Sequence, residues 1–346
     1  MENPSIFFIE IHNLQEHING VLMTKIALIG CTSKKQDHTC PAIEMYSKSS
    51  YFNKKLKYCK NANIDIIFIL SAKYGLLDPD TIIEPYNVFL KNQTKDYKLE
   101  WNQRVLEDLR NKTNMEKDEF IILAGNEYVK DLLEFIPNHY NPVKGLGIGY
   151  QSFYFQNFKS EINAKDLRNE SERLKIENQP GFYKWWAKKE EFDLILEKLN
   201  VDFEDIKGDI EKRNDYYSIY VGIAANESIR DRLNWHVNDL HTESKVKNGT
   251  LSTFRQSISS IIVNDQSNKE CTDEFIDKLK IEYFTLDLPI KSEEAKYSLE
   301  KFEKLLMDTN LYILNIRDNH HFLAKPIKKQ LKALRKKAKE NGLKAF

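Results

Sequence analysis

Three uniformly apolar runs in the first half of the chain constrain its fold more than any other feature. They are rich in β-branched residues and lie at Lys25–Gly30, Ile64–Ala72 and Glu119–Gly125. None alternates between apolar and polar residues, which is typical of strands buried on both faces of a parallel sheet. Helix-like stretches separate or follow them, around 43–60, 97–114 and 127–135. This alternation predicts an α/β domain with a doubly wound, mostly parallel sheet over residues 1–160.

Polar residues gather where these strands end, which is where a doubly wound sheet forms its sites. Lysines there suit a phosphate, tyrosines suit a stacked base, and Asp80 suits activation of water or support of an oxocarbenium ion. The alternative is that the glycines and prolines only mark turns and that the lysines and Asp80 are solvated. The candidate pocket residues are Cys31, Ser33, Lys34, Lys35, Ser71, Lys73, Tyr74, Asp80, Tyr86 and Gly125.

The composition changes after Phe158. Residues 159–179 are charged and lack an apolar pattern, so we expect a linker over 161–178 that ends before Pro180-Gly181. Short strand signals at Gly181–Trp186 and Tyr216–Ile223 and several helical patterns follow. They predict a second, small α+β domain over residues 179–346.

Each of these two short strands carries a tyrosine beside a glycine. If they pair like a hairpin, Tyr183 and Tyr220 point from one face of the sheet. The alternative is a pair of ordinary amphipathic strands.

A helix with an Arg–His pair is predicted next along the chain, with Asn226 as its N-cap. Ile229, Leu233 and Val237 form its buried stripe, and Arg232 and His236 lie four residues apart beside that stripe. A guanidinium and an imidazole held together suit a scissile phosphate. The alternative is a solvated helix face.

A later helix carries a carboxylate at the edge of its apolar stripe. Leu299, Phe302 and Leu306 define the stripe, and Glu303 lies near Leu299 on the helical wheel. A half-buried carboxylate needs a proton, a partner or a metal, and it is a ligand that Mg²⁺ accepts. The alternative is a glutamate that reaches out to water.

In their order along the chain, these patterns resemble the GIY-YIG endonuclease family over residues 179–340. Gly181-Phe-Tyr183 resembles the first signature and Tyr220-Val-Gly222 the second. The Arg232–His236 pair, Glu303 and Leu314-Asn315 resemble the arginine, histidine, glutamate and terminal L-N motif, and the segment 252–255 resembles an S-T-x-R motif of one bacterial branch. The tyrosines lie farther apart than in compact members, so an inserted helix is expected around 188–199.

The resemblance implies a metal-dependent endonuclease that hydrolyses DNA phosphodiester bonds with Mg²⁺ or Mn²⁺. Glu303 would bind the metal, Tyr183 would deprotonate or orient the attacking water, and Arg232 would clamp the phosphate. Tyr220 and His236 would complete the hydrogen-bond network, with Asn315 in support. The lysine that often follows the second signature is Ile223 here, so Lys184, Arg230 or Lys245 would have to supply positive charge.

The first domain resembles a bacterial domain of unassigned function with a C-S-x-K start and an S-A-K-Y-G-L-L-x-P-D core. It also resembles, less closely, uracil-DNA-glycosylase-like domains of modified-nucleobase metabolism. Fused to a nuclease, such a domain implies recognition or excision of a modified nucleobase, with modified phage DNA as the partner in defence. The alternative is a nucleic-acid-binding or RNA repair or modification protein whose nuclease fold is inactive or directed at RNA.

The net charge of zero, from 52 basic and 52 acidic residues, excludes a polycation but conceals a basic end. Lys325–Phe346 carries nine of the basic residues against Glu340 alone, and these suit DNA phosphates. The alternative is an exposed helix with Ile327, Leu331 and Leu334 as its buried stripe. The opening MENPSIFFIEIHN has no basic n-region, and no apolar run approaches the ~20 residues of a membrane span, so we expect a soluble, cytoplasmic protein without a membrane partner.

Overall fold

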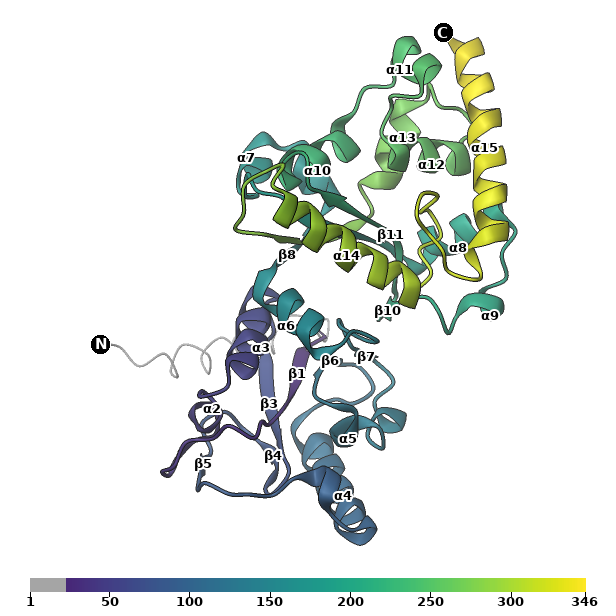
Figure 1. Cartoon of the computed structure of the whole chain (residues 1–346). Coiled ribbons are helices and arrows are strands. Elements are labelled where there is room, and N and C mark those ends of the chain that lie inside the picture. Colours follow the sequence, from purple (N-terminus) through teal and green to yellow (C-terminus); the bar gives the residue numbers. More distant parts are fainter. Residues whose placement is uncertain (1–22) are drawn as a thin grey trace, which may run out of the picture.

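The computed structural model describes residues 23–346, which form two units, each built around its own five-stranded sheet (Figure 1). The expectation drawn from the opening segment concerns residues 1–22 and lies outside the described residues. No helix within the described range is both long enough and apolar enough to cross a membrane.

The N-terminal sheet has the order β4-β3-β1-β6-β7. The three predicted runs form β1 (Lys25–Gly30), β3 (Ile66–Ser71) and β6 (Glu119–Leu123), and β1 pairs in parallel with both of the others. Beyond β6 lies the parallel strand β7 (His139–Tyr140), and β4 (Gly75–Leu77) is antiparallel to β3. The predicted parallel pairing is therefore confirmed at the centre of the sheet, whereas the edge strand β4 is antiparallel.

Helices cover both faces of this sheet because successive residues of a strand point to opposite sides. Ala27 and Ile29 pack in one cluster with α3 (Ser50–Asn61) and α6 (Ile148–Asn157), whereas Ile26 and Leu28 pack in another with α4 (Lys95–Lys112). The chain leaves β1 toward β3 and returns to β6 on the other side, so the direction of winding reverses between β1 and β6. The smaller elements are β2 (Cys40–Pro41), α2 (Ala42–Met45), β5 (Ile82–Ile83), α5 (Asn126–Val129) and the 3₁₀ turns Leu90–Asn92 and Leu133–Phe135.

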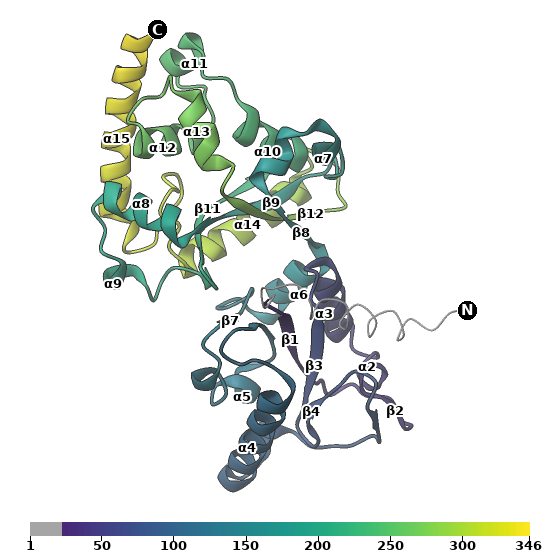
Figure 2. The ribbon, with the colours of Figure 1, turned by 180° about the vertical axis from the view of Figure 1, so that it is seen from behind.

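The C-terminal sheet is antiparallel throughout and has the order β10-β11-β9-β12-β8. Helices α10 and α14 lie on opposite sides of it (Figure 2). The expected inserted helix is present as α8. The strands are β8 (Phe158–Asn163), β9 (Gly181–Lys188), β10 (Lys212–Arg213), β11 (Tyr216–Ala224) and β12 (Lys280–Thr285). The helices are α8 (Lys189–Leu199), α9 (Phe203–Ile206), α10 (Ile229–Asn238), α11 (Glu243–Asn248), α12 (Thr253–Ile262), α13 (Lys269–Ile276), α14 (Glu293–Thr309) and α15 (Ala324–Ala345).

Residues 161–178, expected to be a linker, are instead folded into the C-terminal unit. They begin within the edge strand β8, which pairs with β12, and continue through a 3₁₀ turn (Ala164–Arg168) and α7 (Glu170–Leu174). Ala164, Leu167 and Ile176 are buried. Most of the charged residues between them face solvent, and Arg168 pairs with Asp273 and Asp277 far along the chain. The few buried positions are too sparse to produce an apolar pattern.

The two units share a buried seam. Helix α6 runs directly into β8, and the Tyr154 hydroxyl on α6 donates to Glu282 of β12 over 2.6 Å. Arg213 of β10 pairs with Glu119 of β6 and with Glu161 of β8. A single hydrophobic cluster also continues from the α3 side of the first sheet to the α14 side of the second.

Candidate active site

The two tyrosines lie on one face of the C-terminal sheet because of a β-bulge. Before the bulge Ser218 stands opposite Trp186, and after it Tyr220 stands opposite Trp185 and Gly222 opposite Tyr183. Directly opposed residues share a face, as do residues two apart along a strand. Without the extra residue, Tyr220 would oppose Lys184 and point to the other side. The tyrosine rings are 6.3 Å apart and nearly parallel.

Two glycines of the signatures are explained by close approach. A Cβ at Gly222 would lie 2.4 Å from the Tyr183 hydroxyl oxygen and 2.6 Å from its Cζ atom. A Cβ at Gly181 would lie 2.3 Å from the Phe284 carbonyl oxygen of β12. Only glycine therefore leaves room for the Tyr183 ring across β11 and for the tight pairing of β9 with β12.

Helix α10 brings His236 to Tyr183. Its N-cap is Ser228, whose side chain accepts from the Asp231 N–H, so the expected cap Asn226 is wrong by two residues. Ile229, Leu233 and Val237 are fully buried as predicted. His236 is also fully buried, with Nε2 at 2.7 Å from the Tyr183 hydroxyl and Nδ1 at 2.6 Å from the Ser252 hydroxyl.

Burial makes both members of this pair neutral. It raises the pKa of Tyr183 well above its ordinary value, although Arg232 acts in the opposite direction. It lowers the pKa of His236 well below its ordinary value, and the positive charges of Arg232 and Arg255 add to that effect. A neutral imidazole has one donor and one acceptor nitrogen, so Ser252, His236 and Tyr183 form a chain along which a proton can pass.

Arg232 lies beside this chain with part of its guanidinium unused. One Nη atom pairs with Glu227 at 2.5 Å, and the guanidinium lies over the Trp235 ring at 5.2 Å. Its Nε atom is buried without a hydrogen-bond partner among the described residues. An unsatisfied buried donor on a cation is costly and is satisfied well by an anionic oxygen.

Glu303 lies on α14, the helix on the opposite side of the sheet from α10. Leu299, Phe302 and Leu306 are buried as predicted, and Glu303 is half-buried. The pKa of Glu303 is raised to about 7 by burial and by the nearby Asp318 and Glu300 carboxylates, with Arg232 acting in the opposite direction. The charges of Glu303 and Arg232 both reach Tyr183 and Tyr220.

The chemistry of these carboxylates fits a hard divalent cation. Glu303 makes no ion pair or hydrogen bond within residues 23–346, and a carboxylate held near another carboxylate is stabilised by such an ion. The same residues contain no group of three or more His, Cys, Asp or Glu side chains arranged as a metal site. A bound Mg²⁺ would therefore be held by Glu303 together with water and phosphate oxygens.

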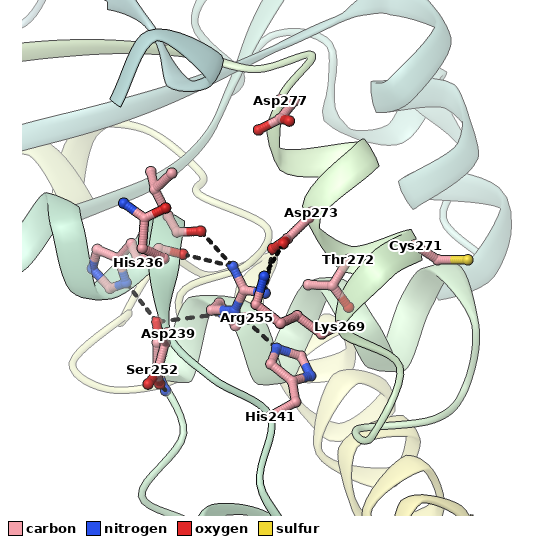
Figure 3. A network of polar contacts seen from close by, with 12 residues as sticks. His236, Asp239, His241, Ser252, Arg255, Lys269, Cys271, Thr272, Asp273 and Asp277 are labelled. Atoms are coloured by element: carbon pink, nitrogen blue, oxygen red, sulfur yellow. Dashed lines mark hydrogen bonds and ion pairs between the residues drawn. The ribbon is translucent and has the colours of Figure 1, made fainter. Parts of the chain in front are cut away.

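A network of buried polar contacts around Arg255 fixes the end of α10 (Figure 3). Arg255 is fully buried and donates to the carbonyls of His236 and Val237, at 3.3 and 2.8 Å, and to Nε2 of His241 at 2.8 Å. It also pairs with Asp273 at 2.6 Å. The arginine of the 252–255 segment thus positions His236 and Ser252 and does not itself face Tyr183.

The two supporting residues named from the sequence have different surroundings. Asn315 is buried and clamps β11 next to Tyr220: its Nδ2 donates to the Val221 carbonyl over 2.8 Å and its Oδ1 accepts from the Val221 N–H over 2.9 Å. Lys184 points away from Tyr183, on the opposite face of β9. It is 1 % exposed and pairs with Glu211 at 2.9 Å, within the seam between the two units. Lys184 is therefore not brought to the tyrosines.

A second polar cluster occupies the strand ends of the N-terminal sheet. The Cys31 sulfur lies 3.2 Å from the Tyr128 hydroxyl, and the Tyr86 hydroxyl lies 2.8 Å from both the Ser71 and the Tyr46 hydroxyls. The Lys35 ammonium lies over the Tyr86 ring, 4.4 Å from its centre. These side chains follow β1, β3 and β6, so they meet at the point where the winding reverses.

The most informative residue of this cluster was missed in the sequence. Lys55 of α3 is 4 % exposed and makes no ion pair or hydrogen bond within the described residues; its ammonium lies over the Tyr51 ring at 4.3 Å. Burial lowers the pKa of Lys55 to about 8, against an opposing effect of Cys31. In an amphipathic helix a lysine is normally solvated, and no signal in the sequence marks this one.

The other predicted pocket residues are placed less centrally. Lys73 is exposed and donates to the Tyr74 hydroxyl over 2.9 Å, and the Tyr74 ring packs edge-on against Tyr86. Gly125 is the N-cap of α5. Ser33, Lys34 and Asp80 are exposed in loops, with no side-chain hydrogen bond or ion pair to the described residues.

Comparison with known proteins divides the chain in the same way as its two sheets. Residues 26–157 match a family of unknown function (DUF6884). No curated protein and no solved structure is significantly similar to the chain. Residues 181–337 match the family described as the GIY-YIG catalytic domain, so the C-terminal half of this chain carries a GIY-YIG domain, which indicates a nuclease acting on DNA.

Proposed function

We propose that the protein is a metal-dependent endonuclease that hydrolyses DNA phosphodiester bonds at the Tyr183–Tyr220 face of the C-terminal sheet. The observation that carries this proposal is the 2.7 Å contact between Tyr183 and a buried, neutral His236. Arg232, with an unsatisfied buried Nε, and the half-buried Glu303 both act electrostatically on Tyr183. A proton acceptor, a phosphate ligand and a metal ligand thus converge on one place.

The chain's own residues suggest the following chemistry. Arg232 binds the scissile phosphate, and the negative charge of that phosphate offsets the guanidinium charge that adds to burial in lowering the pKa of His236. The Tyr183 hydroxyl then orients the attacking water and takes its proton, as it gives its own proton to His236 Nε2. Ser252 holds the imidazole in place through Nδ1. A divalent ion at Glu303 would supply charge neutralisation at the phosphate and at the leaving oxygen.

We further propose that the N-terminal unit reads a modified nucleobase in phage DNA. Aromatic rings, two lysines without carboxylate partners and a cysteine at the strand ends suit a planar, anion-bearing ligand. Asp80, expected to activate water for excision of the base, lies exposed in a turn, so the proposal is recognition of the base and not its excision. The combination with a nuclease is what suggests defence against phage.

One set of reactions tests both parts. Wild-type protein is incubated with unmodified, hydroxymethylated and glucosylated duplex DNA, with and without Mg²⁺, and strand breaks and free bases are measured separately. We expect Mg²⁺-dependent breaks that Tyr183→Phe reduces at least 100-fold and the exposed control Tyr297→Phe leaves unchanged. Equal cutting by wild type and Tyr183→Phe would refute the assignment of the site. Release of a free base would show that the N-terminal unit excises, and equal cutting of all three DNAs would remove its role as a reader.

A further inference from the structure

Helix α15 carries the basic end of the chain and is packed firmly on the nuclease unit. Leu331, Ala338 and Gly342 are buried on its inner side, where it lies along α12 (Figure 1). The Gln266 N–H donates to the Ala338 carbonyl over 3.0 Å, and a Cβ at Gly342 would lie 2.8 Å from the backbone nitrogen of Ser267. The basic residues are therefore displayed from a fixed helix.

These cations have no acidic partners. None of the nine lysines and arginines between Lys325 and Phe346 forms an ion pair with a carboxylate in the described part of the chain. Lys328 donates to the carbonyl oxygen of Asn319 over 2.7 Å. Their charge is thus uncompensated by carboxylates of the described residues.

Four of the cations line one hollow. Lys332, Arg335, Lys336 and Lys339 are spaced at i, i+3, i+4 and i+7, which places them on one face of the helix. They border a cavity of about 350 Å³ together with Gly249, Gln256, Gln266 and Ile316, and no acidic residue lines it.

Arg335 is the anchor of this hollow, and a neighbouring segment connects the hollow to the strand of Tyr220. Its guanidinium donates to the side-chain oxygen of Gln256, whose own amide nitrogen is bound to the Leu251 carbonyl at 2.5 Å. Arg335 therefore has a neutral partner and no counter-ion among the described residues. Burial lowers the pKa of Arg335. Ile316, which lines the same hollow, follows Asn315, and the Asn315 side chain is hydrogen-bonded to Val221 beside Tyr220.

We propose that this hollow binds backbone phosphates of the DNA strand being cut, next to the scissile phosphate held at Arg232. The inference rests on the proposed nuclease function. Guanidinium and ammonium groups without carboxylate partners are the groups that recognise phosphate oxygens, and a row of them along a helix beside the active site follows a charged polymer. The surface supplies affinity and register along the strand, and it carries no base recognition.

The test compares two charge-matched double variants of the full chain. The first variant, Lys332→Ala with Lys336→Ala, removes two cations from the hollow. The control, Lys337→Ala with Lys344→Ala, removes two cations from elsewhere on the same helix. All four side chains are exposed, so we expect both variants to fold. Both are made in the Glu303→Gln background, and duplex DNA binding is measured from 50 to 300 mM salt. Each phosphate contact contributes about 0.9 to the slope of log K against log salt. We expect the slope to fall by about 1.8 for the hollow pair and by less than half of that for the control pair.

Equal losses in the two double variants would overturn the proposal, because the helix would then act only through its diffuse charge. A second measurement locates the contact. Replacing a single phosphate near the cut by a neutral methylphosphonate should weaken binding by the parent protein but not by the hollow variant. If the wild type cuts no DNA while these binding differences persist, the nuclease assignment fails and the phosphate site stands. If cutting is normal and the binding differences are absent, the phosphate site fails and the nuclease assignment stands.

Discussion

Substitution of Gly222 by alanine adds only one methyl group, and it is a severe test of the geometry of the site. The added Cβ would lie 2.4 Å from the Tyr183 oxygen and 2.6 Å from Cζ, whereas ordinary contacts of a Cβ are 3.4–4 Å. The Tyr183 ring must therefore retreat by about 1 Å. His236, fully buried and 2.7 Å from the hydroxyl, stands in the same contact and cannot keep its position relative to the ring.

The size of the effect follows from that displacement. A misplacement of about 1 Å at reacting groups costs about 100-fold in rate. Overpacking a buried site costs about 1–3 kcal/mol of stability. We expect Gly222→Ala to cut DNA at least 100-fold more slowly in single-turnover reactions with excess enzyme and to unfold at lower urea concentration.

Two further variants make this prediction specific. Gly208→Ala is the matched control, because nothing lies within 4 Å of a Cβ at that position, and it should cut at the wild-type rate. Adding Tyr183→Phe to Gly222→Ala removes the closest atom of the clash, so part of the stability should return while activity stays low. A Gly222→Ala protein that cuts at the wild-type rate would refute the placement of Tyr183.

Three other outcomes follow from buried polar groups. Lys55→Met should raise the free energy of unfolding by roughly 1–3 kcal/mol at pH 7, because the native pKa of Lys55, about 8, lies below its unfolded value of 10.5. Because folding favours the neutral amine, the wild type gains stability as the pH rises from about 8 to 10.5. The stability advantage of Lys55→Met should therefore vanish by pH 10.5. An equal advantage at pH 7 and pH 10.5 in urea unfolding would contradict this. Lys184→Met should lower stability by about 3–5 kcal/mol in thermal unfolding, since Glu211 is left buried without its cation, whereas the exposed Lys189→Met should change it little. Ser252→Ala should slow cleavage about 10- to 100-fold by freeing His236 Nδ1, and Ser252→Thr should restore the rate; a slow Ser252→Thr with wild-type stability would argue against the hydroxyl's role.

The N-terminal strands were predictable because their burial on both faces leaves an uninterrupted apolar run. All three runs coincide with β1, β3 and β6 to within two residues at each end. The edge strand β8 was not, because only one of its six residues is fully buried and the rest read as a charged linker. The strand is placed by its pairing with β12, far along the chain, and a local sequence pattern does not predict that pairing.

The active site likewise contains residues that a sequence pattern predicts and a feature that it does not. Tyr183, Tyr220, Arg232, His236 and Glu303 carry recognisable spacing, and the structure brings them within contact or electrostatic reach of one another. The face on which Tyr220 lies depends on the β-bulge after Ser218, and no local sequence pattern predicts that bulge. Lys184 was expected as one of three cations that could replace the lysine missing at Ile223. It lies away from the site because neighbours along a strand point to opposite faces.

The central claim is that Glu303 and the tyrosine–histidine pair form one hydrolytic centre, and the most direct measurement is cleavage by two neighbouring charge-neutral variants. Glu303→Gln removes the half-buried carboxylate, and Glu300→Gln removes an exposed one from the preceding turn of α14. With Mg²⁺ and duplex DNA, we predict that Glu303→Gln loses cutting by at least 1,000-fold while it binds DNA as well as the wild type, and that Glu300→Gln retains full activity. Undiminished cutting by Glu303→Gln, or equal losses in both variants, would contradict the account.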